Sequence, residues 1–82
     1  MSMRQEMLQT FQRIASEIAE REVTVPGEGT PISDLGIDSL GMLEIVGSME
    51  REFKIRIPDD QLVGINTVGQ LVDLVQKRVG QG

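Results

Sequence analysis

Apolar residues recur at every third or fourth position near the start of the chain, which predicts an amphipathic helix over residues 3–21. Charged and amide side chains occupy the positions between them, and no glycine or proline interrupts the run. One face of this helix is therefore expected to pack into a core while the other meets solvent. The apolar positions are Met7, Leu8, Phe11, Ile14, Ala15, Ile18 and Ala19.

The pattern breaks over residues 22–38, where prolines and glycines follow one another closely and predict a long loop. Ile32, Leu35 and Ile37 lie near its end and are expected to hold that part of the loop against the core. The stretch 26–30 fits a flexible connection better, because it contains two glycines and one proline.

A second apolar run predicts a helix over residues 39–53, although its two internal glycines weaken the signal. Its buried stripe is expected to comprise Leu40, Leu43, Val46, Met49 and Phe53, with Met42 and Ile45 beside it. Residues 54–58 alternate in polarity and end in proline, so they are expected to be extended. Asp59 and Asp60 are then expected to cap a short helical turn that reaches Val63 and ends at Gly64.

The last predicted helix starts with a clear signal, since Thr67 and Gln70 have the spacing of a capping box. Its apolar stripe is Val68, Leu71, Val72, Val75 and Val79, and Gly80 is expected to end it. Together these elements predict an all-α fold. We expect a small four-helix bundle, with three main helices, one short helix and a long first loop, as one domain over residues 1–82.

The composition narrows the possible functions. The chain has no cysteine and no histidine, which excludes disulfides and zinc–thiolate sites and removes the commonest general base. Its net charge of −5 argues against nucleic acid as a partner and favours partners with basic surfaces. No apolar run approaches the roughly 18 residues that a membrane span needs, and no signal peptide is evident. We therefore expect a cytoplasmic, monomeric protein that is not an enzyme.

The candidate chemistry lies at Ser39, which follows Asp38 at the predicted start of the second helix. One interpretation is purely structural, because Ser and Asp are both preferred helix caps. Another is that the hydroxyl carries a phosphate-linked group, which the backbone N–H groups and the dipole of the helix N-terminus would stabilise. A hydrolase that uses Ser39 as nucleophile, or Asp59 with Asp60, is disfavoured because no histidine is present to activate it.

The stretch from Asp34 to Leu40, Asp-Leu-Gly-Ile-Asp-Ser-Leu, resembles the modification site of acyl carrier proteins. The resemblance continues in order along nearly the whole chain. It includes Glu44-Ile45-Val46, the segments Met49–Phe53 and Ile55–Asp60, and Thr67–Leu71. A lone Asp-Ser-Leu would be weak evidence, but the ordered set of motifs is specific.

This resemblance implies a four-helix bundle whose Ser39 receives 4′-phosphopantetheine from coenzyme A, added by a magnesium-dependent phosphopantetheinyl transferase. Acyl groups would then be carried as thioesters on the terminal thiol of this arm. Asp38 would help the transferase recognise the site. Acyl-loading and acyl-processing enzymes with basic docking surfaces would bind along the second helix, at Leu40, Met42, Glu44, Glu50 and Glu52. The resemblance implies no catalytic residue and no resident metal.

Several positions depart from the family pattern and dilute the acidic surface: Gly41, Met42, Arg51, Lys54 and Arg56. They favour a dedicated set of partner enzymes, in a polyketide, specialised-lipid or amino-acyl pathway, over housekeeping fatty-acid synthesis. The resemblance as a whole implies a carrier for fatty-acid, polyketide or specialised lipid synthesis, and the length of the chain fits a free-standing protein. The alternative is an interaction module that keeps the fold without the modification. An acyl chain held between the helices would meet Leu43, Val46, Met49, Ile57, Ile65, Leu71 and Val75, which read more simply as core residues.

Overall fold

Three α-helices and two short 3₁₀ helices account for the regular structure of the chain. The computed structural model describes the backbone of residues 2–81 and the side chains of residues 2–80. The elements in order are α1 (Met3–Ala19), η1 (Ile32–Leu35), α2 (Ser39–Phe53), η2 (Asp59–Leu62) and α3 (Val68–Gln81). The all-α class is confirmed, with no strand among the described residues. The expected fourth helix, however, is only a 3₁₀ turn, and the long first loop contains a second such turn, η1.

The helix boundaries agree with the sequence at most ends. A capping box at Ser2 starts α1, and α2 has the bounds that were predicted. The capping box at Thr67 is confirmed, because its Oγ1 accepts the N–H of Gln70 at 3.2 Å and the Gln70 side chain accepts the N–H of Thr67 at 3.0 Å.

Three details of the boundaries were predicted wrongly. α1 ends at Ala19, two residues early, because Glu20 adopts the left-handed conformation with φ of 55°. α3 runs through Gly80, since an exposed glycine weakens a helix by only about 1 kcal/mol and does not forbid it. The residue that precedes η2 is Pro58, and neither Asp59 nor Asp60 forms a side-chain cap there.

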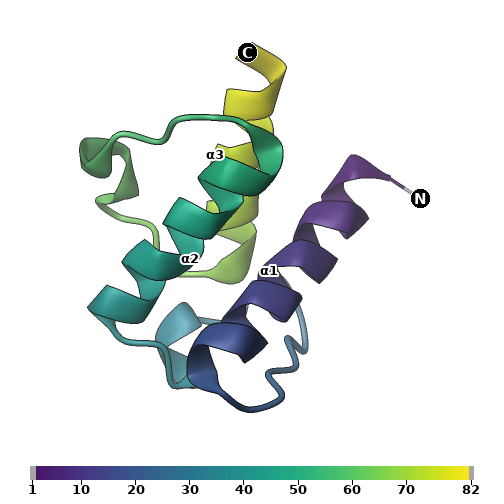
Figure 1. Cartoon of the computed structure of the whole chain (residues 1–82), viewed down its shortest axis with the longest axis vertical. Coiled ribbons are helices and arrows are strands. Elements are labelled where there is room, and N and C mark those ends of the chain that lie inside the picture. Colours follow the sequence, from purple (N-terminus) through teal and green to yellow (C-terminus); the bar gives the residue numbers. More distant parts are fainter. Residues whose placement is uncertain (1, 82) are drawn as a thin grey trace.

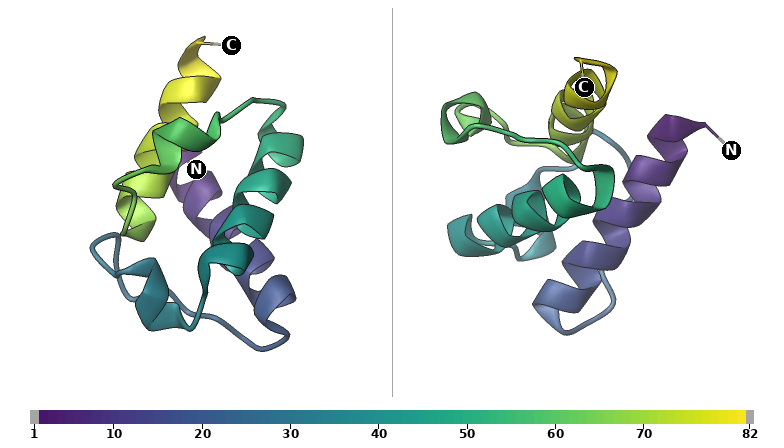
Figure 2. Two further views of the ribbon diagram at one scale, coloured as in Figure 1. Left: turned by 90° about the vertical axis from the view of Figure 1, so that its left-hand side faces the viewer. Right: turned by 45° about the horizontal axis from the view of Figure 1, so that its top comes forward.

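The first helix contacts both of the others. α1 packs against α2 and α3, and the chain runs down α1 and back up through α2 and α3, so that both termini lie at the same end (Figure 1). The connection between α2 and α3 lies on the far side of these two helices from α1 (Figure 2). The core fills the space between the three helices, and its completely buried large side chains are Met7, Phe11, Val23, Ile45, Met49, Leu71, Val68, Val72 and Val75.

The buried face of α2 differs from the predicted stripe. Leu40 and Leu43 are 64% and 51% exposed, whereas Gly41 is buried together with Ile45, Val46 and Met49. The reason is the close approach of neighbouring segments to the start of this helix. A Cβ atom at Gly41 would lie 3.1 Å from the Ile37 Cγ2 atom, so any larger residue would need Ile37 to move by a few tenths of an ångström. The helix therefore turns its two leucines toward solvent.

Main-chain hydrogen bonds hold the long first loop against the start of α3. The Glu28 and Thr30 carbonyls accept the N–H groups of Gly69 and Val68, at 2.8 and 3.1 Å, and Ile32 donates its N–H to the carbonyl of Asn66 at 2.8 Å. The prediction that residues 26–30 form a flexible connection is therefore wrong. The prediction that Ile32, Leu35 and Ile37 hold the loop on the core is confirmed, since all three are buried.

An ion-pair network fastens the same loop to two helices. The Arg4 guanidinium donates hydrogen bonds to Glu28 and lies 2.7 Å from a carboxylate oxygen of Asp73. The hydrogen bond from Arg4 holds the pKa of Glu28 below its usual range. This pairing therefore stabilises the fold above the pKa that Glu28 has in the unfolded chain. The contribution is lost as the pH falls through the lowered pKa.

Candidate functional site

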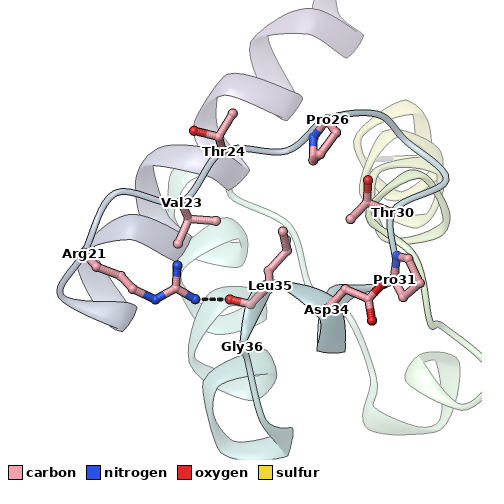
Figure 3. A pocket seen from close by; sticks show the side chains of 9 residues that line it. All are labelled: Arg21, Val23, Thr24, Pro26, Thr30, Pro31, Asp34, Leu35 and Gly36. Atoms are coloured by element: carbon pink, nitrogen blue, oxygen red, sulfur yellow. Dashed lines mark hydrogen bonds between the residues drawn. The ribbon is translucent and has the colours of Figure 1, made fainter.

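A tight turn presents Ser39 at the start of α2. Gly36 has φ of 78°, in the left-handed region that favours glycine, and Ile37 is buried behind it. Figure 3 shows the Arg21 side chain, from the end of α1, donating a hydrogen bond to the Leu35 carbonyl. A Cβ atom on Gly36 would lie 2.7 Å from this guanidinium. The turn therefore favours glycine through its positive φ, and a Cβ atom would also displace the end of the Arg21 side chain. No sequence pattern had indicated this contact.

The roles of the two candidate cap residues are now distinct. Asp38 is the N-cap of α2, and its Oδ1 atom accepts the N–H of Gly41 at 2.7 Å. Ser39 is the first helical residue and is exposed, and in the described part of the chain its hydroxyl has no hydrogen-bond partner. Capping of α2 therefore accounts for Asp38, whereas the Ser39 hydroxyl makes no contact that stabilises the described fold.

Ser39 lies in the first turn of α2, where the helix leaves backbone N–H groups without partners of its own. The N–H of Met42 bonds to the Asp38 carbonyl at 2.9 Å and that of Gly41 to the Asp38 side chain. Helix geometry leaves the N–H groups of Ser39 and Leu40 without acceptors within α2. These donors and the positive end of the helix dipole favour a negatively charged group at this position.

An open groove of about 540 Å³ begins at Ser39 and runs between α2 and the segment that contains η2. Met42 and Leu43 line one side, and Leu62 and Ile65 line the other. Of the residues expected to meet an acyl chain, only Leu43 and Ile65 line this groove. The remaining five, Val46, Met49, Ile57, Leu71 and Val75, are buried in the core. A separate hollow of about 650 Å³ lies beside Arg21 and does not include Ser39 (Figure 3).

The three carboxylates predicted along α2 are not equivalent. Glu44 is exposed and has no partner among the described residues. Glu50 is half-buried, and its Oε2 atom accepts the N–H of Ile57 at 2.7 Å. Glu52 is exposed but pairs with Arg13 of α1 at 2.9 Å. Among the described residues, Glu44 is therefore the one carboxylate of α2 without a partner. The Glu50 carboxylate instead holds the segment after α2 in place through its hydrogen bond to Ile57.

The site lacks the parts of a catalytic centre. Asp38 directs its carboxylate to the backbone of α2, so it is not placed as a base for Ser39. No group of three or more Asp or Glu residues in the described chain is arranged to hold a metal ion. In the same residues no helix is both long and apolar enough to cross a membrane.

Replacing Asp38 with alanine is expected to lower the free energy of unfolding by about 1 kcal/mol, because the N–H of Gly41 loses its acceptor. Asp38→Asn retains an acceptor oxygen and serves as the matched control, with a loss of only a few tenths of a kcal/mol expected. Urea denaturation followed by circular dichroism measures both values. Equal stability of Asp38→Ala and the wild type would show that the cap is not formed in solution.

Comparison with known proteins identifies one family throughout. The family model described as "Phosphopantetheine attachment site" matches residues 9–75. An acyl carrier protein of Amoebophilus asiaticus is 44% identical over 64 residues, which cover 78% of this chain and 78% of that protein. A protein of Mycobacterium leprae named meromycolate extension acyl carrier protein is 43% identical over 79 residues, covering 87% of this chain and 69% of that protein.

The fold agrees with the sequence relatives. The crystal structure of an acyl carrier protein from Thermotoga maritima superposes with a TM-score of 0.87 at 31% sequence identity. The superposition covers 95% of this chain and 92% of that one.

Proposed function

Since the chain belongs to the acyl carrier protein family with its phosphopantetheine attachment site, we propose that Ser39 is the residue that carries the 4′-phosphopantetheine arm. The observation that carries this proposal is the free, exposed hydroxyl at the first residue of α2, beside a cap that Asp38 alone provides. We further propose that Asp38 helps the transferase to recognise the site, and that residues 1–82 act as one carrier domain.

The protein is a carrier and not a catalyst. Its prosthetic group supplies a thiol that holds acyl groups as thioesters, so a chain without cysteine takes part in thiol chemistry. The chain itself supplies a rigid helix start. There the free N–H groups of Ser39 and Leu40 stabilise negative charge beside the hydroxyl. The apolar wall of Met42, Leu43, Leu62 and Ile65 offers a surface on which an alkyl chain can lie.

The named relatives support a role in acyl-chain extension. Several proteins 42–43% identical to this one are called meromycolate extension acyl carrier proteins. We propose that this chain likewise presents acyl groups to the enzymes that extend them. Leu40, Met42 and Glu44 are exposed or half-exposed near Ser39 and are the residues we expect such enzymes to contact. Glu50 and Glu52 are weaker candidates, because their carboxylates are already bonded within the fold.

The test of carriage uses an acyl-coenzyme A, magnesium and a broad-specificity phosphopantetheinyl transferase. The protein should gain the mass of one acyl-phosphopantetheine, and neutral hydroxylamine should then remove the acyl group alone, because it cleaves thioesters. A gain that resists hydroxylamine would contradict thioester carriage. The unmodified interaction module is not favoured, since it gives no reason for a serine hydroxyl free of structural contacts.

A further inference from the structure

Basic side chains gather at the C-terminal end of α2, although the chain has more acidic residues than basic ones. Arg51, Lys54 and Arg56, the basic cluster, are all exposed, and no carboxylate in the described residues pairs with any of them. By contrast, Arg4 and Arg13 each pair with carboxylates. Arg51 donates one hydrogen bond, to the Ser48 hydroxyl at 3.2 Å, but no carboxylate of the described chain offsets the repulsion between these like charges.

A hollow of about 350 Å³ lies among these cations. Arg51 and Arg56 lie on its edge, and Gly47 leaves it open, because a Cβ atom there would have only an Arg51 guanidinium nitrogen nearby, at 3.8 Å. Glu50 also lines the hollow, but its carboxylate accepts the N–H of Ile57. The hollow therefore offers its cations to a group from outside the chain.

The basic cluster shares a helix face with the residues beside Ser39. Leu40, Glu44, Gly47 and Arg51 follow one another at spacings of four, three and four, which places them along one side of α2. At 1.5 Å per residue, Arg51 lies about 16 Å along the helix from Leu40. From the Ser39 end, this face presents an exposed leucine, then Glu44, then the hollow, and finally cations that no carboxylate among the described residues pairs with.

We propose that this face of α2 docks the condensing enzyme that extends the carried acyl chain, and that this enzyme presents carboxylates to the basic cluster. Measured along the helix axis, those carboxylates would lie about 18 Å or more from Ser39, which carries the group that the enzyme receives. The proposal rests on the proposed carrier function and reverses the expected charge of the partner at one end of the interface. Basic residues of the enzyme would meet Glu44 only.

A protein surface fits the basic cluster better than an anionic membrane does. The net charge of −5 repels a negatively charged lipid surface as a whole. The apolar side chains next to the cluster, Phe53 and Ile55, are only partly exposed, so the site lacks apolar groups for insertion. Complementary charge on a protein partner needs no such insertion.

The test measures KM and kcat of the condensing enzyme from the same organism, with the acylated protein as the varied substrate. The test variant is the double substitution Arg51→Gln and Lys54→Gln. The control variant is the double substitution Gln9→Glu and Lys77→Gln. The control changes the net charge by the same amount, on α1 and α3. We expect the α2 variant to raise KM about fivefold or more at low salt with kcat unchanged, and the control to change KM less than about twofold. The difference should fade at about 0.5 M salt.

An unchanged or lower KM for the α2 variant would overturn the docking proposal. If KM is unchanged and the α2 variant also loses binding to phosphatidylglycerol-containing vesicles that the wild type binds, the cluster is assigned to a membrane instead. Intact mass after the transferase reaction separates the two proposals. Normal modification with unchanged KM refutes only the docking surface, whereas absence of modification in the wild type refutes the carrier site. Circular dichroism confirms that both variants are folded.

Discussion

Replacing Ser39 with alanine is expected to abolish acyl carriage completely while leaving the stability of the fold almost unchanged. The hydroxyl is the proposed attachment point, so without it no arm and no thioester can form. Its loss costs the fold little, because the hydroxyl has no hydrogen-bond partner in the described chain and alanine favours helices. Asp38 still accepts the N–H of Gly41 and keeps the helix capped.

A serine that carries the arm and a purely structural serine differ in what Ser39→Ala should change: acyl carriage in the first case, the stability of the fold in the second. Thermal unfolding followed by circular dichroism should give a melting temperature close to the wild type, and the hydroxylamine-released acyl group should be undetectable. Ser33 is the matched control, because it lines the same groove and is exposed. Ser33→Ala should keep full carriage. A large drop in melting temperature for Ser39→Ala, with carriage retained, would support the structural role instead.

Replacing Phe11 with alanine is expected to have the largest effect on stability, a loss of about 3–5 kcal/mol in the free energy of unfolding. Phe11 is one of only two aromatic residues and is completely buried at the centre of α1, the helix that contacts both others. Small domains have a total stability of about 5–15 kcal/mol, so this variant should lose a large fraction of its stability and unfold at a clearly lower temperature than the wild type. Its efficiency as a transferase substrate should fall accordingly.

The matched control for Phe11 is Leu40, another large apolar side chain but one that is 64% exposed. Leu40→Ala should change the free energy of unfolding by no more than about 0.5 kcal/mol in urea denaturation. If Phe11→Ala lost less than about 1.5 kcal/mol, the core would not be organised around α1 as described.

The comparison of Leu40 with Gly41 also shows where the sequence is informative and where it is not. Periodicity located the three α-helices and the residues at most of their ends, because these features depend on local spacing and on caps such as Thr67 with Gln70. It assigned the wrong face to the start of α2. The buried face includes Gly41, which packs closely against Ile37, and this approach is a property of the folded packing.

For the candidate site, too, the local part could be predicted from the sequence and the part that depends on folding could not. The motif around Asp38 and Ser39 is local, and the two residues lie at the start of α2, where the helix pattern predicted them. The acidic surface was less predictable, because Glu50 bonds to Ile57, seven residues on, and Glu52 pairs with Arg13 on another helix. Both contacts arise only in the folded chain, so a count of carboxylates along α2 overestimates how many of them are free to bind a partner.

The central claim, that Ser39 carries the phosphopantetheine arm, is tested most directly by intact mass spectrometry after reaction with coenzyme A, magnesium and a phosphopantetheinyl transferase. We expect a gain of one phosphopantetheine for the wild type and for Ser33→Ala, and no gain for Ser39→Ala. Failure of the wild type to gain that mass, or an equal gain in Ser39→Ala, would contradict it.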